Sequence, residues 1–130
     1  MATLNVSLTL TSTDVSSDSL SMTVSDALTV VSPTQSNSRV TATTTGGDNI
    51  IVPNLDSPRY VFLKHTGLNS AGSSSGTDKV HVETADGTTI MELKTGEFAF
   101  FPYYKEGAGL LQLEASANTV QVEYAFFTRG

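Results

Sequence analysis

The chain has 130 residues, no cysteine, and seven basic residues against thirteen acidic ones, giving a formal net charge of −6. This length fits a single domain, which buries about two thirds of the surface that its unfolded chain exposes. The absence of cysteine excludes disulfides, thiolate metal sites and cysteine nucleophiles. The few basic residues never cluster, so a phosphate-binding face is excluded and neither nucleic acid nor an anionic membrane is an expected partner.

Two further patterns bear on location. No apolar stretch approaches the roughly 18 residues that a membrane span needs. The first residues, Met1 to Asn5, show no basic region leading into an apolar one, so we expect no secretion signal. The absence of cysteine suits a protein that is assembled in a reducing cytosol.

The N-terminal segment alternates apolar and polar residues with a period of two, which is typical of half-buried strands. One face collects Leu4, Val6, Leu8 and Leu10, and the same pattern returns at Leu20, Met22, Val24, Leu28 and Val30. Asp26 interrupts the second apolar series and is interpreted as a bulge or a strand end. We predict that residues 1–31 form edge strands or an interaction arm, separable from the rest of the domain.

The middle of the chain reads as short strands between turns. We predict a loop over residues 33–38, a strand over 39–43, a turn over 46–49 and a short apolar strand ending at Pro53. Residues 59–65 are apolar on both faces at their centre, as in a central sandwich strand. Residues 67–76 are rich in serine and glycine and are predicted to form a mobile surface loop.

A predicted hairpin follows. Asp86-Gly87 fits a two-residue type I′ turn, which pairs Val82 with Met91, Val80 with Leu93, His81 with Glu92 and Glu83 with Ile90. A second tight turn at Thr95-Gly96 would place Phe98 opposite Leu93 and Phe100 opposite Met91, making a three-stranded meander.

The C-terminal part predicts another hairpin. A turn at Ala117-Asn118 would pair Leu113 with Val122 and Leu111 with Tyr124, with Val120, Val122, Tyr124 and Phe126 on one face of the last strand. No segment shows helical periodicity over three turns. We therefore predict an all-β, single-domain antiparallel β-sandwich over residues 1–130, jelly-roll-like, with about nine to ten short strands and little or no helix.

Reactive groups are sparse. His81 is interpreted as the partner of Glu92 across the hairpin, and His65 has no evident partner in the sequence. No serine lies in a Gly-x-Ser-x-Gly motif. Five aspartates in loops or at strand ends could serve a calcium ion, but no EF-hand pattern exists: Asp14, Asp18, Asp48, Asp56 and Asp78. We expect no enzyme activity, no catalytic or metal-binding residues and no cofactor.

The string Phe100-Phe101-Pro102-Tyr103-Tyr104 is the most concentrated apolar stretch. In the predicted meander, Phe101 and Tyr103 point away from the core face, so either a second sandwich layer or a partner must cover them. A sugar-binding platform of stacked rings is a third alternative. The candidate interface residues are Leu4, Val6, Leu8, Leu10, Phe101, Tyr103 and Tyr104.

Two motifs carry a resemblance: residues 59–67 (RYVFLKHTG) and residues 93–102 (LKTGEFAFFP), with Val122-Glu123-Tyr124 near the end. Together they resemble a family of small virion structural proteins of tailed phages, especially marine and cyanobacterial ones. In that family a tyrosine, an apolar strand and Lys-Asn-Thr precede a Leu-x-x-Gly-Glu-Phe-Ala-x-Phe-Pro segment, and here His65 replaces the asparagine. The likeness covers residues 28–130.

The resemblance implies a β-sandwich present in many copies on the particle. The first expectation is a capsid decoration (cement) protein on the outer shell, a homo-oligomer with a trimer favoured, bound to the major capsid protein. The negative charge agrees with the outside, because packaged DNA would repel it. The alternatives are a tail or baseplate component and a carbohydrate-binding module for host recognition, with its site at Tyr103, Tyr104 or the loop over residues 67–76.

Overall fold

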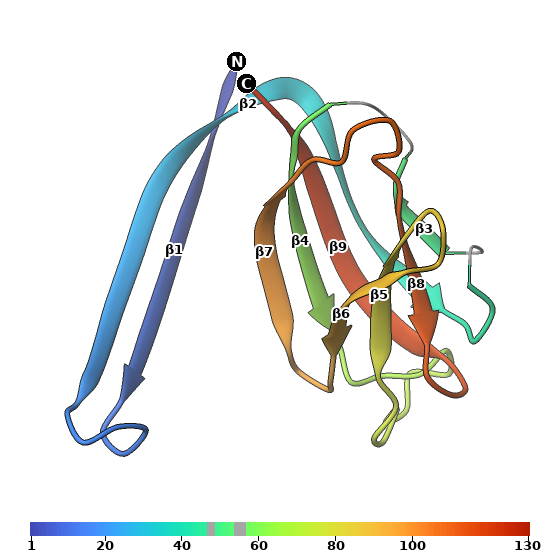
Figure 1. Ribbon diagram of the computed structural model, residues 1–130. Helices are drawn as coiled ribbons and strands as arrows, with labels where there is room; N and C mark the ends of the chain where they lie inside the picture. Colours follow the sequence, from blue (N-terminus) through green and yellow to red (C-terminus); the bar gives the residue numbers. More distant parts are fainter. Residues whose placement is uncertain (47–48, 54–56) are drawn as a thin grey trace. The chain divides into compact units, whose positions relative to one another are not determined.

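A computed structural model describes residues 1–46, 49–53 and 57–130, without the side chains of 32–37 (Figure 1). Gly47, Asp48 and Asp56, which figured in the predicted turn and the calcium hypothesis, lie outside the described residues. The described residues contain no helix and form nine strands: β1 Ala2–Ser12, β2 Leu20–Ala42, β3 Asn49–Val52, β4 Arg59–His65, β5 Val80–Thr84, β6 Thr89–Leu93, β7 Phe98–Tyr103, β8 Leu111–Ala115 and β9 Val120–Arg129.

The strands form two antiparallel sheets, ordered β1-β2-β9-β4-β7 and β3-β8-β5-β6. Without β1, the orders 2-9-4-7 and 3-8-5-6 are those of an eight-stranded jelly roll, in which successive strands mostly change sheet. The predicted fold class, an all-β sandwich with jelly-roll topology, is therefore confirmed. Pro102 is tolerated within a strand because β7 is the last strand of its sheet and has a free edge.

The chain divides into two compact units, Met1–Pro33 with Gly130, and Thr34–Arg129. Strand β2 belongs to both: it pairs with β1 from Leu20 to Val30, and its later part lies beside β9, where Arg39 bonds to Glu123 at 2.7 Å. The predicted loop over residues 33–38 is wrong, because β2 runs through it. Proline accepts extended backbone and loses only a hydrogen-bond donor, so Pro33 does not interrupt the strand.

The core of the second unit lies between its two sheets. Alternate residues of β4 and β9 face inward, and Val61, Leu63 and Val122 are each at most 1% exposed. The opposite layer contributes the alternating residues of β5 and β8. The buried core comprises Ala42, Ile51, Val52, Val61, Leu63, Val80, Val82, Leu93, Leu111, Leu113, Ala115, Val120 and Val122.

The β5–β6 hairpin has the predicted pairs Val80–Leu93, His81–Glu92 and Val82–Met91, but its turn differs from the prediction. Only Gly87 has a positive φ, of 82°, and its N–H donates to the carbonyl of Thr84. This geometry is a type I turn with a left-handed glycine, not a type I′ turn. The additional loop residue shifts the register, so Glu83 lies opposite Thr89 instead of Ile90.

The predicted three-stranded meander is wrong beyond β6, because β7 lies in the other sheet and pairs with β4. The turn at Thr95-Gly96 is present, but its backbone docks on the end of β4: the N–H of Gly96 donates to the carbonyl of His65, and the N–H of His65 donates to the carbonyl of Glu97. The predicted β8–β9 hairpin is wrong for the same reason, since β8 pairs with β3 and β5 while β9 pairs with β4.

The serine- and glycine-rich loop over residues 67–76 is closed by hydrogen bonds instead of being open. The side-chain carbonyl of Asn69 accepts from the N–H groups of Ala71 and Ser73, and the side chain of Gln121 on β9 donates to the backbone carbonyl of Asn69 at 2.6 Å. These bonds fix the loop to the sandwich, so its composition was a poor guide to its geometry.

Candidate interaction surfaces

The β1–β2 hairpin carries an apolar face that its own unit leaves open. Its register pairs even-numbered residues with even-numbered residues, from Ala2–Val30 to Ser12–Leu20, so their side chains share one side. At the far end of the hairpin this face is largely solvent-exposed: Leu8 41%, Leu10 46%, Met22 54% and Val24 64%. Exposed apolar side chains grouped in this way mark interaction surfaces.

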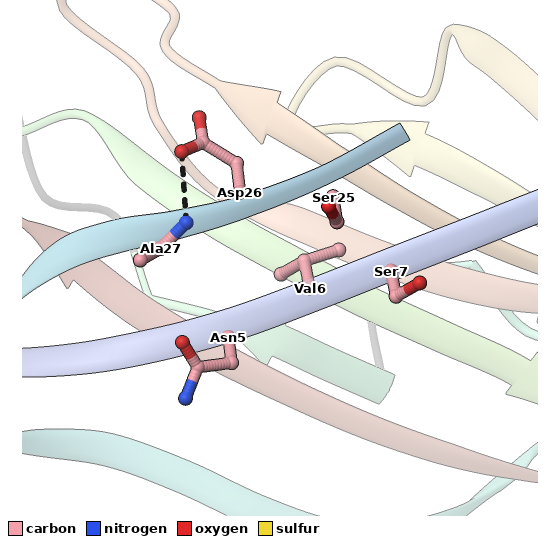
Figure 2. A pocket seen from close by; sticks show the side chains of 6 residues that line it. All are labelled: Asn5, Val6, Ser7, Ser25, Asp26 and Ala27. Carbon is pink, nitrogen blue, oxygen red and sulfur yellow. Dashed lines mark hydrogen bonds between the residues drawn. The ribbon is translucent and has the colours of Figure 1, made fainter. Parts of the chain in front are cut away.

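Asp26 lies within this apolar face, opposite Val6. The predicted bulge or strand end at Asp26 is wrong, because the β1–β2 pairing continues through it without a register shift. Its carboxylate accepts a hydrogen bond from the N–H of Ala27 at 2.8 Å (Figure 2). The sequence interruption is thus one charge placed on an otherwise apolar strip.

A shallow open depression crosses the hairpin at this point, lined by Asn5, Val6, Ser7, Ser25, Asp26 and Ala27 (Figure 2). Small-molecule sites normally enclose most of their ligand. This depression has only small side chains around it, so it suits a contact with another protein surface better than an enclosed ligand.

The second unit carries an aromatic face on the outer side of its larger sheet. The register places Phe127, Tyr60 and Pro102 in one row across β9, β4 and β7, and Ala125, Phe62 and Phe100 in the next. The third row is Glu123, Lys64 and Phe98, and Phe98 is 58% exposed. Tyr60 stacks on Phe100 with ring centroids 6.0 Å apart, and the Arg129 guanidinium lies 5.4 Å from the Tyr60 ring.

The structure inverts the predicted faces of β7. Phe101 and Tyr103 pack against the buried core, and their rings meet edge to face at 6.1 Å. Phe98 and Phe100, which were predicted to be core residues, belong to the outer aromatic face. The inversion follows from pairing β7 with β4 instead of β6. Tyr104, just past the end of β7, is 53% exposed.

Among the predicted interface residues, the hairpin thus brings together Leu4, Val6, Leu8 and Leu10, while Phe101 and Tyr103 are partly buried against the core. The sequence reading did not identify Phe98, Tyr60 or Phe62 as surface residues. The signal was present in residues 59–65, whose apolar side chains fall on both faces of the strand.

Both histidines have structural partners. His65 is fully buried; its Nδ1 accepts from the N–H of Gly67 at 3.0 Å, so its Nε2 carries the proton and donates to the carbonyl of Asp78 at 2.9 Å. His81 lies 3.1 Å from the carboxylate of Glu92, which Lys79 also approaches at 3.3 Å. These two partners lower the pKa of Glu92, His81 contributing most.

Glu83 is a buried carboxyl group, 5% exposed. The side-chain amide of Gln112 donates to it at 3.3 Å, and Gly46 closes over it so tightly that an added Cβ would lie 3.3 Å from Glu83 and 2.9 Å from Glu114. Burial raises the pKa of Glu83, and the neighbouring Glu114 adds to the rise, while the bond from Gln112 and the nearby His81 oppose it.

Arg59 is a second buried ionisable group, 2% exposed, and its burial lowers the pKa of the guanidinium. It donates to the hydroxyl of Ser57 at 3.1 Å, and its guanidinium lies 5.5 Å from the centre of the Phe126 ring. These contacts place the charge against the ring of Phe126, on the core side of the sheet at the start of β4.

Within the described ranges, no group of three or more His, Cys, Asp or Glu side chains is arranged to hold a metal ion. In the same ranges, no helix is long and apolar enough to cross a membrane.

Comparison with known proteins gives a distant likeness to solved structures. No family model matches the chain, and no curated protein matches it. A solved structure described as "Bacillus endospore appendages form a novel family of disulfide-linked pili" aligns with a TM-score of 0.42 and 17% sequence identity, over 79% of this chain and 91% of that chain. A likeness at this level does not assign a family.

Proposed function

We propose that this protein is a non-enzymatic structural subunit of a tailed-phage particle, acting in many copies as a capsid decoration protein on the outer shell. The observation that carries the proposal is the exposed apolar face of the β1–β2 hairpin, around Leu8, Leu10, Met22 and Val24. A solvated apolar strip of this kind is stabilised when another protein covers it.

Three further observations support the proposal. The motifs at residues 59–67 and 93–102 resemble those of small phage virion proteins. Both histidines are engaged in structural contacts, as expected of a structural protein. The net charge of −6 favours a place away from packaged DNA.

Labelling of phage particles with antibodies raised against the recombinant protein tests the location. Labels spread over the shell would support decoration. Labels confined to the tail would assign the protein to a tail or baseplate instead, and unlabelled particles would contradict a virion role.

The role of the hairpin is tested by deletion of residues 1–10 and sedimentation of the purified protein with stripped capsids. We expect the deletion to abolish binding while the sandwich stays folded, because the strip loses Leu4, Val6, Leu8 and Leu10. Full binding by the truncated protein would contradict the interaction-arm assignment.

A further inference from the structure

Each of the two compact units carries an apolar face that the strands of that same unit do not cover. The first is the hairpin strip around Leu8, Leu10, Met22 and Val24. The second is the aromatic face of the larger sheet, defined by Tyr60, Phe62, Phe98, Phe100 and Phe127. Flat sheet faces of this kind pack on each other at about 10 Å, with interdigitated side chains.

The charges on the two faces are complementary. The hairpin strip carries one ionised group, Asp26, on a two-stranded apolar ribbon. The aromatic face carries Lys64 between Phe98 and Glu123 in its third row. Arg39 already engages Glu123 at 2.7 Å, and the guanidinium of Arg129 already lies over the Tyr60 ring. Among the described residues of this face, the ammonium group of Lys64 is therefore the cation placed to meet an incoming carboxylate.

From this match we infer that the hairpin strip of one copy docks on the aromatic face of a second copy, with Asp26 directed to Lys64. The inference rests on the proposed function, since it names the partner of the same hairpin. Two strips docking on each other would bring one Asp26 toward the other, so the charge argues for the sheet as receptor.

Such a contact joins two different surfaces and is therefore heterologous. Heterologous contacts generate closed rings when the rotation between copies closes, and open chains when it does not. A ring would use each hairpin and each aromatic face once, leaving no exposed strip on the finished assembly. This geometry accounts for one chain having both faces.

Cysteine cross-linking tests the contact, because the chain has no cysteine of its own. Two variants with different tags, Val24→Cys and Phe98→Cys, are mixed and treated with a short bis-maleimide. We expect a mixed dimer carrying both tags. The matched control replaces Val24→Cys by Thr23→Cys, which lies on the opposite face of the same strand and should cross-link at least several-fold less.

Charge exchange gives a second readout without cysteines. Asp26→Lys and Lys64→Asp should each weaken self-association several-fold in sedimentation velocity, and mixing the two variants should restore it. Equal cross-linking from Thr23 and Val24, or no restoration in the mixed sample, would overturn the inference. Labelling of particles would still test the proposed function independently, because it does not depend on which surface receives the hairpin.

Discussion

The imidazole of His65 donates from Nε2 to the backbone carbonyl of Asp78 at 2.9 Å, across the base of the loop that follows β4. The opposite ring nitrogen accepts from the N–H of Gly67. A fully buried ring thus holds both ends of the residue 67–78 connection.

Replacing His65 by alanine leaves a cavity and two unpaired backbone groups. We expect His65→Ala to lower the free energy of unfolding by about 2–4 kcal/mol. The control is His81→Ala, which removes a surface pair worth less than about 1 kcal/mol. Urea denaturation of both variants measures the difference. Equal losses in the free energy of unfolding would show that the buried ring of His65 does not stabilise this connection.

The raised pKa of Glu83 predicts that the protein loses stability as the pH rises toward neutral. Its pKa is raised in the folded protein above the ordinary value of 4.5, so the folded state holds its proton more tightly than the unfolded chain does. The resulting stability is fully present below about pH 4.5 and is lost as the pH rises through the folded-state pKa.

Glu83→Gln should remove this pH dependence, because an amide oxygen can still accept from Gln112 and carries no charge. Thermal unfolding from pH 4 to pH 8 measures it, with the exposed Glu106→Gln as the matched control. A parallel decline of melting temperature in Glu83→Gln and the parent would contradict the assignment.

Asp86 acts in the opposite direction. Its carboxylate accepts from the hydroxyl of Thr84 and from the N–H of Thr88, and these bonds hold its pKa at about 2, below the ordinary 3.8. The stability that it contributes is present above pH 3.8 and is lost as the pH falls toward 2. Asp86→Ala should lower the melting temperature at pH 6 and flatten its decline in acid. If the melting temperature of Asp86→Ala falls in acid as steeply as that of the parent, the turn does not depend on the carboxylate.

Alternation in the sequence predicted burial better than it predicted pairing. Val80, Val82, Leu111, Leu113, Val120 and Val122 were expected on core faces, and all are fully buried. Burial alone does not reveal pairing, however, because β8 and β9 bury the expected residues although they lie in different sheets. The sequence does not show whether the turns at residues 94–97 and 116–119 join two strands of one sheet or cross between the sheets. The prediction took both as hairpins and therefore assigned β7 and β9 to the wrong neighbours.

For the candidate surfaces too, the local pattern was a good guide in one strand and a poor one in another. Leu4, Val6, Leu8 and Leu10 were predicted from a strand with one apolar face, and the hairpin presents them together. Because the prediction paired β7 with the wrong neighbour, it exchanged the two faces of this strand. In the structure Phe101 and Tyr103 pack against the core, and Phe98 is exposed. Only long-range pairing with β4 decides that choice, and a local pattern does not contain it.

The apolar face of the hairpin is the centre of the account, and the native mass of the full chain tests it most directly. Light scattering over a range of concentrations should give a multimer for the parent protein and a folded monomer for Val24→Asp. Thr23→Asp, which places the same charge on the opposite face, should keep the parent's mass. A monomeric parent at every concentration, or a Val24→Asp variant with the parent's mass, would contradict the account.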